Sequence, residues 1–78
     1  MEIKVMGSGC KNCKKLLRNV EEAAKELQVK AEIKYITDMM EIADSGLMKT
    51  PGLIIDKKIV SAGKVLTKEE AMKIISKY

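Results

Sequence analysis

The sequence predicts an α/β fold with the element order β-α-β-α-β-β-α, in which helices cover a four-stranded mixed sheet. Three observations predict it. Apolar residues alternate with other residues near the N-terminus, they recur with helical spacing directly afterwards, and strand and helix patterns continue to alternate toward the C-terminus. With 78 residues, 46% of them apolar and 33% charged, the chain has the size and composition of one compact domain spanning residues 1–78.

The first strand and the first helix follow from two different periodicities. Ile3 and Val5 alternate with their neighbours as in a strand with one buried face. A glycine-rich turn, residues 7–9, comes next. From Cys10 to Leu27 the apolar residues then occupy the i, i+3, i+4 and i+7 positions of a helix with one buried stripe, and residues 28–30 end it.

A second strand and a short helix are expected next. Ala31, Ile33 and Tyr35 alternate with charged residues, which is typical of a strand. Asp38 has the position of a helix N-cap, and Gly46 has the position at which that helix would end.

The last three elements are two strands and a helix. The apolar run 52–55 predicts a strand, residues 56–58 form a turn, and Ile59 and Val60 begin its antiparallel partner. Thr67 and Glu70 form a capping box for a closing helix that is expected to run to Tyr78. Because a helical crossover joins the first two strands, they should be parallel, so the sheet is mixed.

Charge and aromatic content argue against two classes of partner. The net charge of +4 is carried by lysines with no interleaved aromatic residues, and only 3% of the residues are aromatic, so no base-stacking platform is expected. The N-terminus lacks the apolar stretch of a signal peptide, and no run approaches membrane-spanning length. We therefore expect a cytoplasmic monomer that binds neither nucleic acid nor membrane.

Cys10 and Cys13 are the only cysteines, and they lie at the start of the first helix. A disulfide stabilises a fold mainly by closing a long loop, and this pair would close almost none. In a reducing compartment such a pair is more often catalytic or metal-binding than structural. The pair therefore indicates either reversible thiol oxidation or capture of a soft metal ion such as Cu(I).

The two cysteines are expected to differ. The N–H groups and dipole at the helix start favour the thiolate of Cys10, since cysteines in such positions titrate at roughly 3.5–7.5 instead of about 8.5. Cys13 lies on the apolar stripe and should be buried, as the resolving partner. Lys11, Lys14 and Lys15 either stabilise the Cys10 thiolate or attract an acidic partner, or they lie on a solvated face and do neither.

Thr50 and Pro51 form the second informative motif. A proline is tolerated at the start of a strand because its missing N–H is not needed there. Only about 5–6% of X–Pro bonds in folded proteins are cis, so the residues alone predict a trans bond.

Other polar and sulfur-containing residues have structural interpretations. We expect Asp38 to be a helix cap, and Arg18 and Glu22 to form a surface pair. Four methionines are interpreted as gap-fillers of a core poor in aromatic residues, and not as metal ligands: Met39, Met40, Met48 and Met72.

Together, the helix-opening motif of residues 10–13, Thr50-Pro51 before the third strand, Gly63 after the fourth strand and the capped last helix resemble the thioredoxin superfamily. In length the chain resembles the small thioredoxin- or glutaredoxin-like redox-active disulfide proteins of archaea and bacteria. The resemblance implies a thioredoxin-like fold and the activity of a protein-disulfide reductase in electron transport.

The resemblance also implies roles for particular residues. Cys10 would attack the substrate disulfide, and Cys13 would release the product. Pro51 would be cis and pack beside the cysteines, and the backbone of Thr50 would face the substrate chain. The partners would be disulfide-containing client proteins and an upstream reductase, with no cofactor beyond the Cys10-Cys13 disulfide.

Two departures from the family pattern concern specificity. Thioredoxins usually carry Trp before the first cysteine and Gly-Pro between the two, whereas this chain has Gly9 and Lys11-Asn12. Glutaredoxins carry paired glycines that help to hold glutathione, where this chain has Ala62-Gly63.

Residues 6–13 also resemble the Cu(I)-binding loop of small heavy-metal chaperone domains, Gly-Met-x-Cys-x-x-Cys, although those domains have the order β-α-β-β-α-β. Three further interpretations are a zinc site shared by a dimer, a shared iron–sulfur cluster, and a thioredoxin-like module used only for binding.

Overall fold

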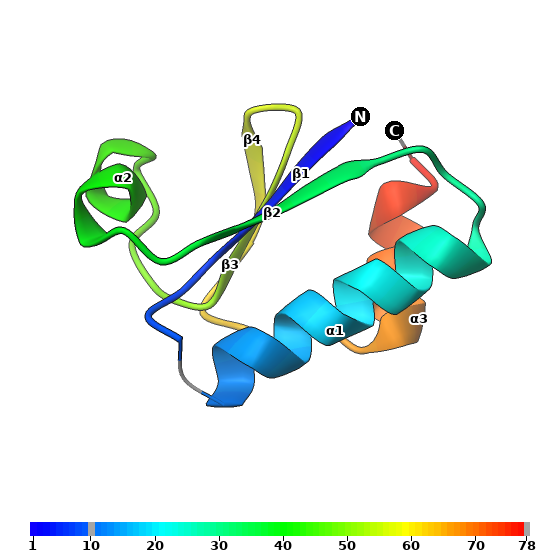
Figure 1. Ribbon diagram of the computed structural model, residues 1–78, viewed down its shortest axis with the longest axis horizontal. Helices are drawn as coiled ribbons and strands as arrows, with labels where there is room; N and C mark the ends of the chain where they lie inside the picture. The colour runs from blue at the N-terminus through cyan, green and yellow to red at the C-terminus, as the bar shows by residue number, and fades with distance from the viewer. Residues whose placement is uncertain (10, 78) are drawn as a thin grey trace.

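The helices and strands follow the predicted order. The computed structural model describes residues 1–9 and 11–77, and its elements are β1 (Glu2–Met6), α1 (Lys11–Glu26), β2 (Glu32–Ile36), α2 (Met39–Asp44), β3 (Gly52–Ile55), β4 (Lys58–Ala62) and α3 (Lys68–Ile75) (Figure 1). The largest difference from the predicted boundaries is at the end of the last helix. The last helix was expected to reach Tyr78, but α3 ends at Ile75 because the Ser76 hydroxyl and the Lys77 N–H bond its last carbonyls. Tyr78 lies outside the described residues.

The four strands form one mixed sheet in the order β2-β1-β3-β4, which confirms the predicted fold class. β1 is parallel to β2 and antiparallel to β3, and β3 is antiparallel to β4. The chain segments that follow β1 and precede β3 therefore meet at the same end of the sheet, because the register pairs Met6 with Gly52.

Helices cover the two faces of the sheet unequally. α1 and α3 lie side by side on one face, and α2 lies apart from them, near the end of β2 (Figure 1). The larger core lies under α1 and α3 and contains Ile3, Val5, Leu16, Val20, Ala23, Ala24, Leu53, Ile55, Leu66, Ala71 and Ile75. A smaller cluster packs with α2 and contains Met6, Ile42, Leu47 and Ile54. The strand residues alternate between the two clusters because successive side chains point to opposite faces.

Three non-glycine residues with positive φ lie directly after α1 and between β3 and β4. α1 ends at Glu26, and Gln28 follows it with a φ of 55°. The N–H groups of Gln28 and Val29 bond the carbonyls of Lys25 and Ala24 at 3.1 Å each. The hairpin between β3 and β4 turns through Asp56 and Lys57, with φ of 47° and 70°. This turn is one residue shorter than predicted.

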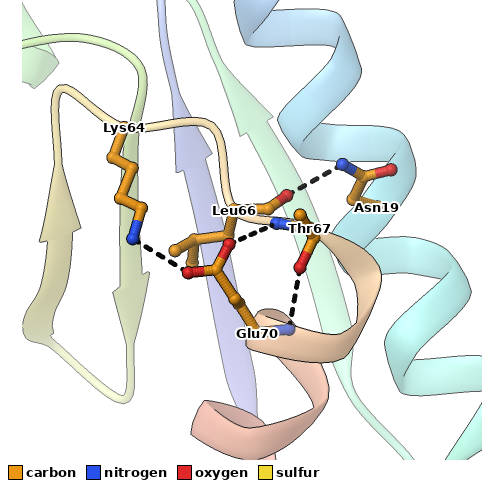
Figure 2. A network of polar contacts seen from close by, with 5 residues as sticks. All are labelled: Asn19, Lys64, Leu66, Thr67 and Glu70. Atoms are coloured by element: carbon orange, nitrogen blue, oxygen red, sulfur yellow. Dashed lines mark hydrogen bonds and ion pairs between the residues drawn. The ribbon is translucent and has the colours of Figure 1, made fainter.

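α3 begins with the predicted capping box. The Thr67 hydroxyl accepts the Glu70 N–H, and a Glu70 carboxylate oxygen accepts the Thr67 N–H, both at 3.1 Å (Figure 2). The other Glu70 oxygen accepts from Lys64 Nζ at 2.8 Å, and Asn19 of α1 donates to the Leu66 carbonyl at 2.8 Å. The Asn19 bond links α1 to the segment that leads into α3, and the other bonds fix the start of α3 itself.

No helix within residues 1–9 and 11–77 has both the length and the apolar content needed to cross a membrane.

Candidate redox site

Cys13 is the third residue of α1, and its side chain is fully buried, at 0% exposure. It lies on the same side of the helix as Leu16 and Val20, which are equally buried, as the helical spacing predicted. Cys10 lies outside the described residues, so the role expected of its sulfur stays a prediction.

Gly7 packs directly against Cys13. A Cβ atom added to Gly7 would overlap Cys13 Sγ and lie 2.7 Å from Cys13 Cβ. Gly7 is itself buried, and its N–H donates to the Ile36 carbonyl at 3.0 Å, so it is fixed to the end of β2. The sequence interpretation treated Gly7 only as part of a turn. Its position directly after a buried strand was the one signal of a close backbone approach.

The Thr50–Pro51 peptide bond is cis, as the family resemblance implied and contrary to the expectation from residue statistics alone. Pro51 is buried and Thr50 is exposed. The Pro51 carbonyl accepts the Gly63 N–H at 2.9 Å, which holds the segment before β3 to the residue after β4.

The sheet brings Gly7 and Pro51 to one place. In the β1–β3 register Met6 is opposite Gly52, so Gly7 is the next residue along one strand and Pro51 the preceding residue of the other. Cys13 contacts Gly7, and therefore the buried cysteine and the proline segment lie at the same end of the sheet. The expected packing of Pro51 on the cysteine pair involves Cys10, which lies outside the described residues.

Lys11 is the first residue of α1 and its side chain is exposed. Lys14 and Lys15 are exposed as well, and the first turn of α1 contains no acidic residue. This end of the helix therefore combines the positive end of the helix dipole with lysine side chains.

The prediction that the methionines fill the core was wrong for three of the four. Met39, Met40 and Met48 are 65%, 72% and 91% exposed, whereas Met72 packs partly buried against the larger core. α2 has only six residues and buries only Ile42 among them, so its other apolar side chains face solvent. Three of the side chains that line a hollow of about 270 Å³ are Met39, Met48 and Thr50.

Two smaller predictions are confirmed. Asp38 caps α2, with its carboxylate accepting the Met40 N–H at 2.9 Å. Arg18 and Glu22 form a surface pair at 3.4 Å. In the described part of the chain, no three Cys, Asp or Glu side chains gather in a cluster that could hold a metal ion.

A four-stranded mixed sheet with these three helices, and a cis proline at the end of the sheet where Cys13 is buried, define a thioredoxin-like α/β protein. A family model described as thioredoxin domain matches residues 1–76, and the chain belongs to this family.

Two similar proteins carry the name thioredoxin. The chain is 43% identical over 76 residues to the one from Methanothermobacter thermautotrophicus, with 97% of this chain and 99% of that protein covered. It is 38% identical over 76 residues to the one from Methanocaldococcus jannaschii, with 97% of this chain and 87% of that protein covered. These relationships assign the chain to the thiol–disulfide oxidoreductases in general.

Proposed function

We propose that this protein reduces disulfides of client proteins, with Cys10 as the attacking thiolate and Cys13 as the resolving thiol. The observation that carries the proposal is the position of Cys13. It is fully buried in the first turn of α1, against Gly7 and three residues after Cys10. A buried second sulfur suits a resolving role, because a large client cannot reach it but a bound sulfur one turn away can.

The reaction has two exchange steps. In the first, the Cys10 thiolate attacks one sulfur of the client disulfide, which forms a mixed disulfide and expels the other client sulfur as a thiolate. In the second, Cys13 loses its proton and attacks Cys10 Sγ, which forms the Cys10-Cys13 disulfide and expels the second client thiolate. The client gains two electrons and the protein loses them to become the disulfide. The two client thiolates then take up two protons, one equivalent to the proton that leaves Cys13 and one from solvent, which received the proton of Cys10 when its thiolate formed.

Three further residues have supporting roles in this proposal. Thr50 is an exposed residue, and its backbone would receive the client chain. Pro51 would form the wall beside the cysteines. Among the described residues, no hydrogen bond occupies the Thr50 backbone, which supports this use. Lys11 would stabilise the Cys10 thiolate, because it adds a positive charge at the start of α1.

We place this activity in the cytoplasm, where an upstream reductase would return the disulfide to the dithiol. The protein would act as a monomer and without a cofactor. A reducing compartment keeps such a pair as thiols at rest, which is the form that reduces clients.

A redox titration tests the proposal. The protein is equilibrated in dithiothreitol or glutathione buffers of graded potential, and its free thiols are trapped and counted. We expect one reversible two-electron transition in the wild type, none in Cys10→Ser, and reduction of insulin by the wild type alone. Cys13→Ser is the matched variant, and we expect it to accumulate the mixed disulfide with its client.

Two results would contradict the proposal. Tight one-to-one binding of Cu(I) with no redox transition would indicate a metal chaperone that uses the same two thiolates. A reversible transition without reduction of insulin would indicate a module that binds partners but does not reduce them.

A further inference from the structure

The first two turns of α1, beginning at the residue after Cys10, carry only basic side chains on one side, and Glu21 and Glu22 follow on that side in the next turn. The basic stripe consists of Lys11, Lys14, Lys15 and Arg18, whose spacing of three, four and seven residues places them on one side of a helix. All four side chains are exposed, and together with Asn12 they line a shallow surface hollow of about 400 Å³. Cys13 lies on the opposite, buried side of the same helix.

The basic stripe gathers four positive charges within the first eight residues of α1. The chain has 15 basic and 11 acidic residues, and the stripe holds four of the basic ones, so eleven basic residues remain against 11 acidic ones. The net charge of +4 therefore equals the charge of the stripe. A surface that concentrates one sign of charge attracts partners of the opposite sign and raises their rate of association.

The charges of the stripe are largely uncompensated. Arg18 pairs with Glu22 at 3.4 Å, but among the described residues no ion pair involves Lys11, Lys14 or Lys15. The first turn of α1 has no acidic residue, and the positive end of the helix dipole adds to the same potential. An anion at this surface would relieve repulsion within the protein.

We propose that the basic stripe is a docking surface for acidic protein segments that lie next to the client disulfide. This inference rests on the proposed function and names its class of client. The stripe starts at Lys11, the residue that follows Cys10 in the sequence, so we expect acidic residues that flank the client disulfide to bind along it when Cys10 attacks. Nucleic acid fits less well, because the chain contains only two aromatic residues, Tyr35 and Tyr78, on which bases could stack.

The experiment uses three peptides, each with one internal disulfide and identical except for flanking glutamate, glutamine or lysine residues. The second-order rate of their reduction by the dithiol protein is measured at low and high salt. We expect the glutamate peptide to react at least about tenfold faster than the lysine peptide at low salt. High salt should remove most of this preference. The Debye length falls from about 30 Å at 0.01 M salt to about 3 Å at 1 M salt, and exposed charges farther apart than this length are screened from each other.

Variants in which lysines are replaced by glutamate test whether the preference for the glutamate peptide depends on the basic stripe. The double variant Lys14→Glu/Lys15→Glu should lose the preference for the glutamate peptide, and it leaves Lys11, the neighbour of Cys10, unchanged. Lys25→Glu/Lys30→Glu is the matched control, since it changes the net charge equally at the far end of α1 and should keep the preference. Circular dichroism shows that both variants are folded.

Three outcomes would overturn the inference: equal rates for all three peptides in the wild type, an equal loss of preference in the control, or tighter binding of a labelled oligonucleotide than of the glutamate peptide. The glutamine peptide separates this inference from the proposed function. If the wild type fails to reduce it, the proposed reductase activity is wrong. If the wild type reduces the glutamine peptide and reduces the glutamate and lysine peptides at the same rate, only the inference of a docking surface is wrong.

Discussion

Gly7 and Cys13 are so close that the space at Gly7 is filled by the cysteine side chain. A methyl group there would overlap Cys13 Sγ and would also crowd Cys13 Cβ, at 2.7 Å. Rotation about the Cα–Cβ bond moves Sγ but not Cβ, so α1 would also have to shift away from the end of β1. Either movement displaces the sulfur that completes the proposed reaction.

The variant Gly7→Ala is therefore expected to slow the resolving step and spare the attack. With one equivalent of an aromatic disulfide, the first released thiolate reports attack by Cys10 and the second reports closure by Cys13. We expect the second phase to slow roughly tenfold or more, because small misplacements of reacting groups cost up to about a hundredfold. Stopped-flow absorbance measures both phases.

Gly52→Ala is the matched control for overpacking. Its added Cβ would overlap the Leu47 side chain instead of a cysteine, so it should lower stability while leaving the second phase unchanged. Equal second phases in Gly7→Ala and the wild type would show that Gly7 does not position the sulfur.

Single residues differ in how well their roles could be predicted. The burial of Cys13 follows from helical spacing, because periodicity identifies the buried side of a helix. The role of Gly7 could not be found this way, since it depends on how closely α1 approaches the end of β1. The cis bond before Pro51 followed from resemblance to a family, and residue statistics predicted the opposite.

At the scale of elements, the start of α3 depends on one carboxylate. Hydrogen bonds from the Lys64 ammonium and from the Thr67 N–H hold the pKa of Glu70 below its ordinary value. A lowered pKa in the folded state means that the ionised side chain contributes stability above the ordinary glutamate pKa of about 4.3. This contribution is lost as the pH falls through the pKa of the folded protein.

A comparison of the wild type with Glu70→Gln tests whether ionised Glu70 stabilises the fold at neutral pH and loses this effect in acid. The wild type should be the more stable protein at pH 7, and the difference in the free energy of unfolding should shrink as the pH falls below about 4. Urea unfolding at pH 7, 4 and 2.5 measures it. Glu69→Gln, the neighbouring carboxylate, is the control and should show a smaller change. A difference that is constant over this range would contradict the assignment.

The starts of α2 and α3 and the β3–β4 hairpin were predicted well from capping and turn residues. Which side chains of α2 face solvent was not predicted. Capping residues located the starts of α2 and α3, and the turn residues located the hairpin, because each signal involves neighbouring residues. The six residues of α2 are too few to show a periodicity, so the sequence did not reveal that Met39 and Met40 face solvent.

At the scale of the whole molecule, the core is divided by the sheet. Among residues 1–9 and 11–77, eleven buried residues form the larger core of the sheet with α1 and α3, whereas four pack with α2 on the other face. Because α2 buries only Ile42 among its own residues, its free energy of local opening should be lower than that of the remaining fold.

Native-state hydrogen exchange is expected to show this difference. The amides of α2 should exchange faster than those of the buried middle of α1, by opening that leaves α1 protected. Ile42→Ala should accelerate exchange in α2 further, since such truncations of buried side chains cost about 2–5 kcal/mol. Val20→Ala is the control and should accelerate exchange across the larger core. Exchange of α2 at the same rate as α1, in wild type and Ile42→Ala alike, would contradict a divided core.

The exposure of Met39, Met40 and Met48 also determines which methionines are oxidised first. Met48, at 91% exposure, presents its thioether to peroxide, while Met6, at 2%, is shielded within the smaller core cluster. Sulfoxide would form first on the surface, where an added oxygen disturbs no packing and reductases can remove it. The conditions that oxidise the dithiol would thus also form repairable sulfoxides on α2 and the loop that follows it, while the buried Met6 stays unmodified.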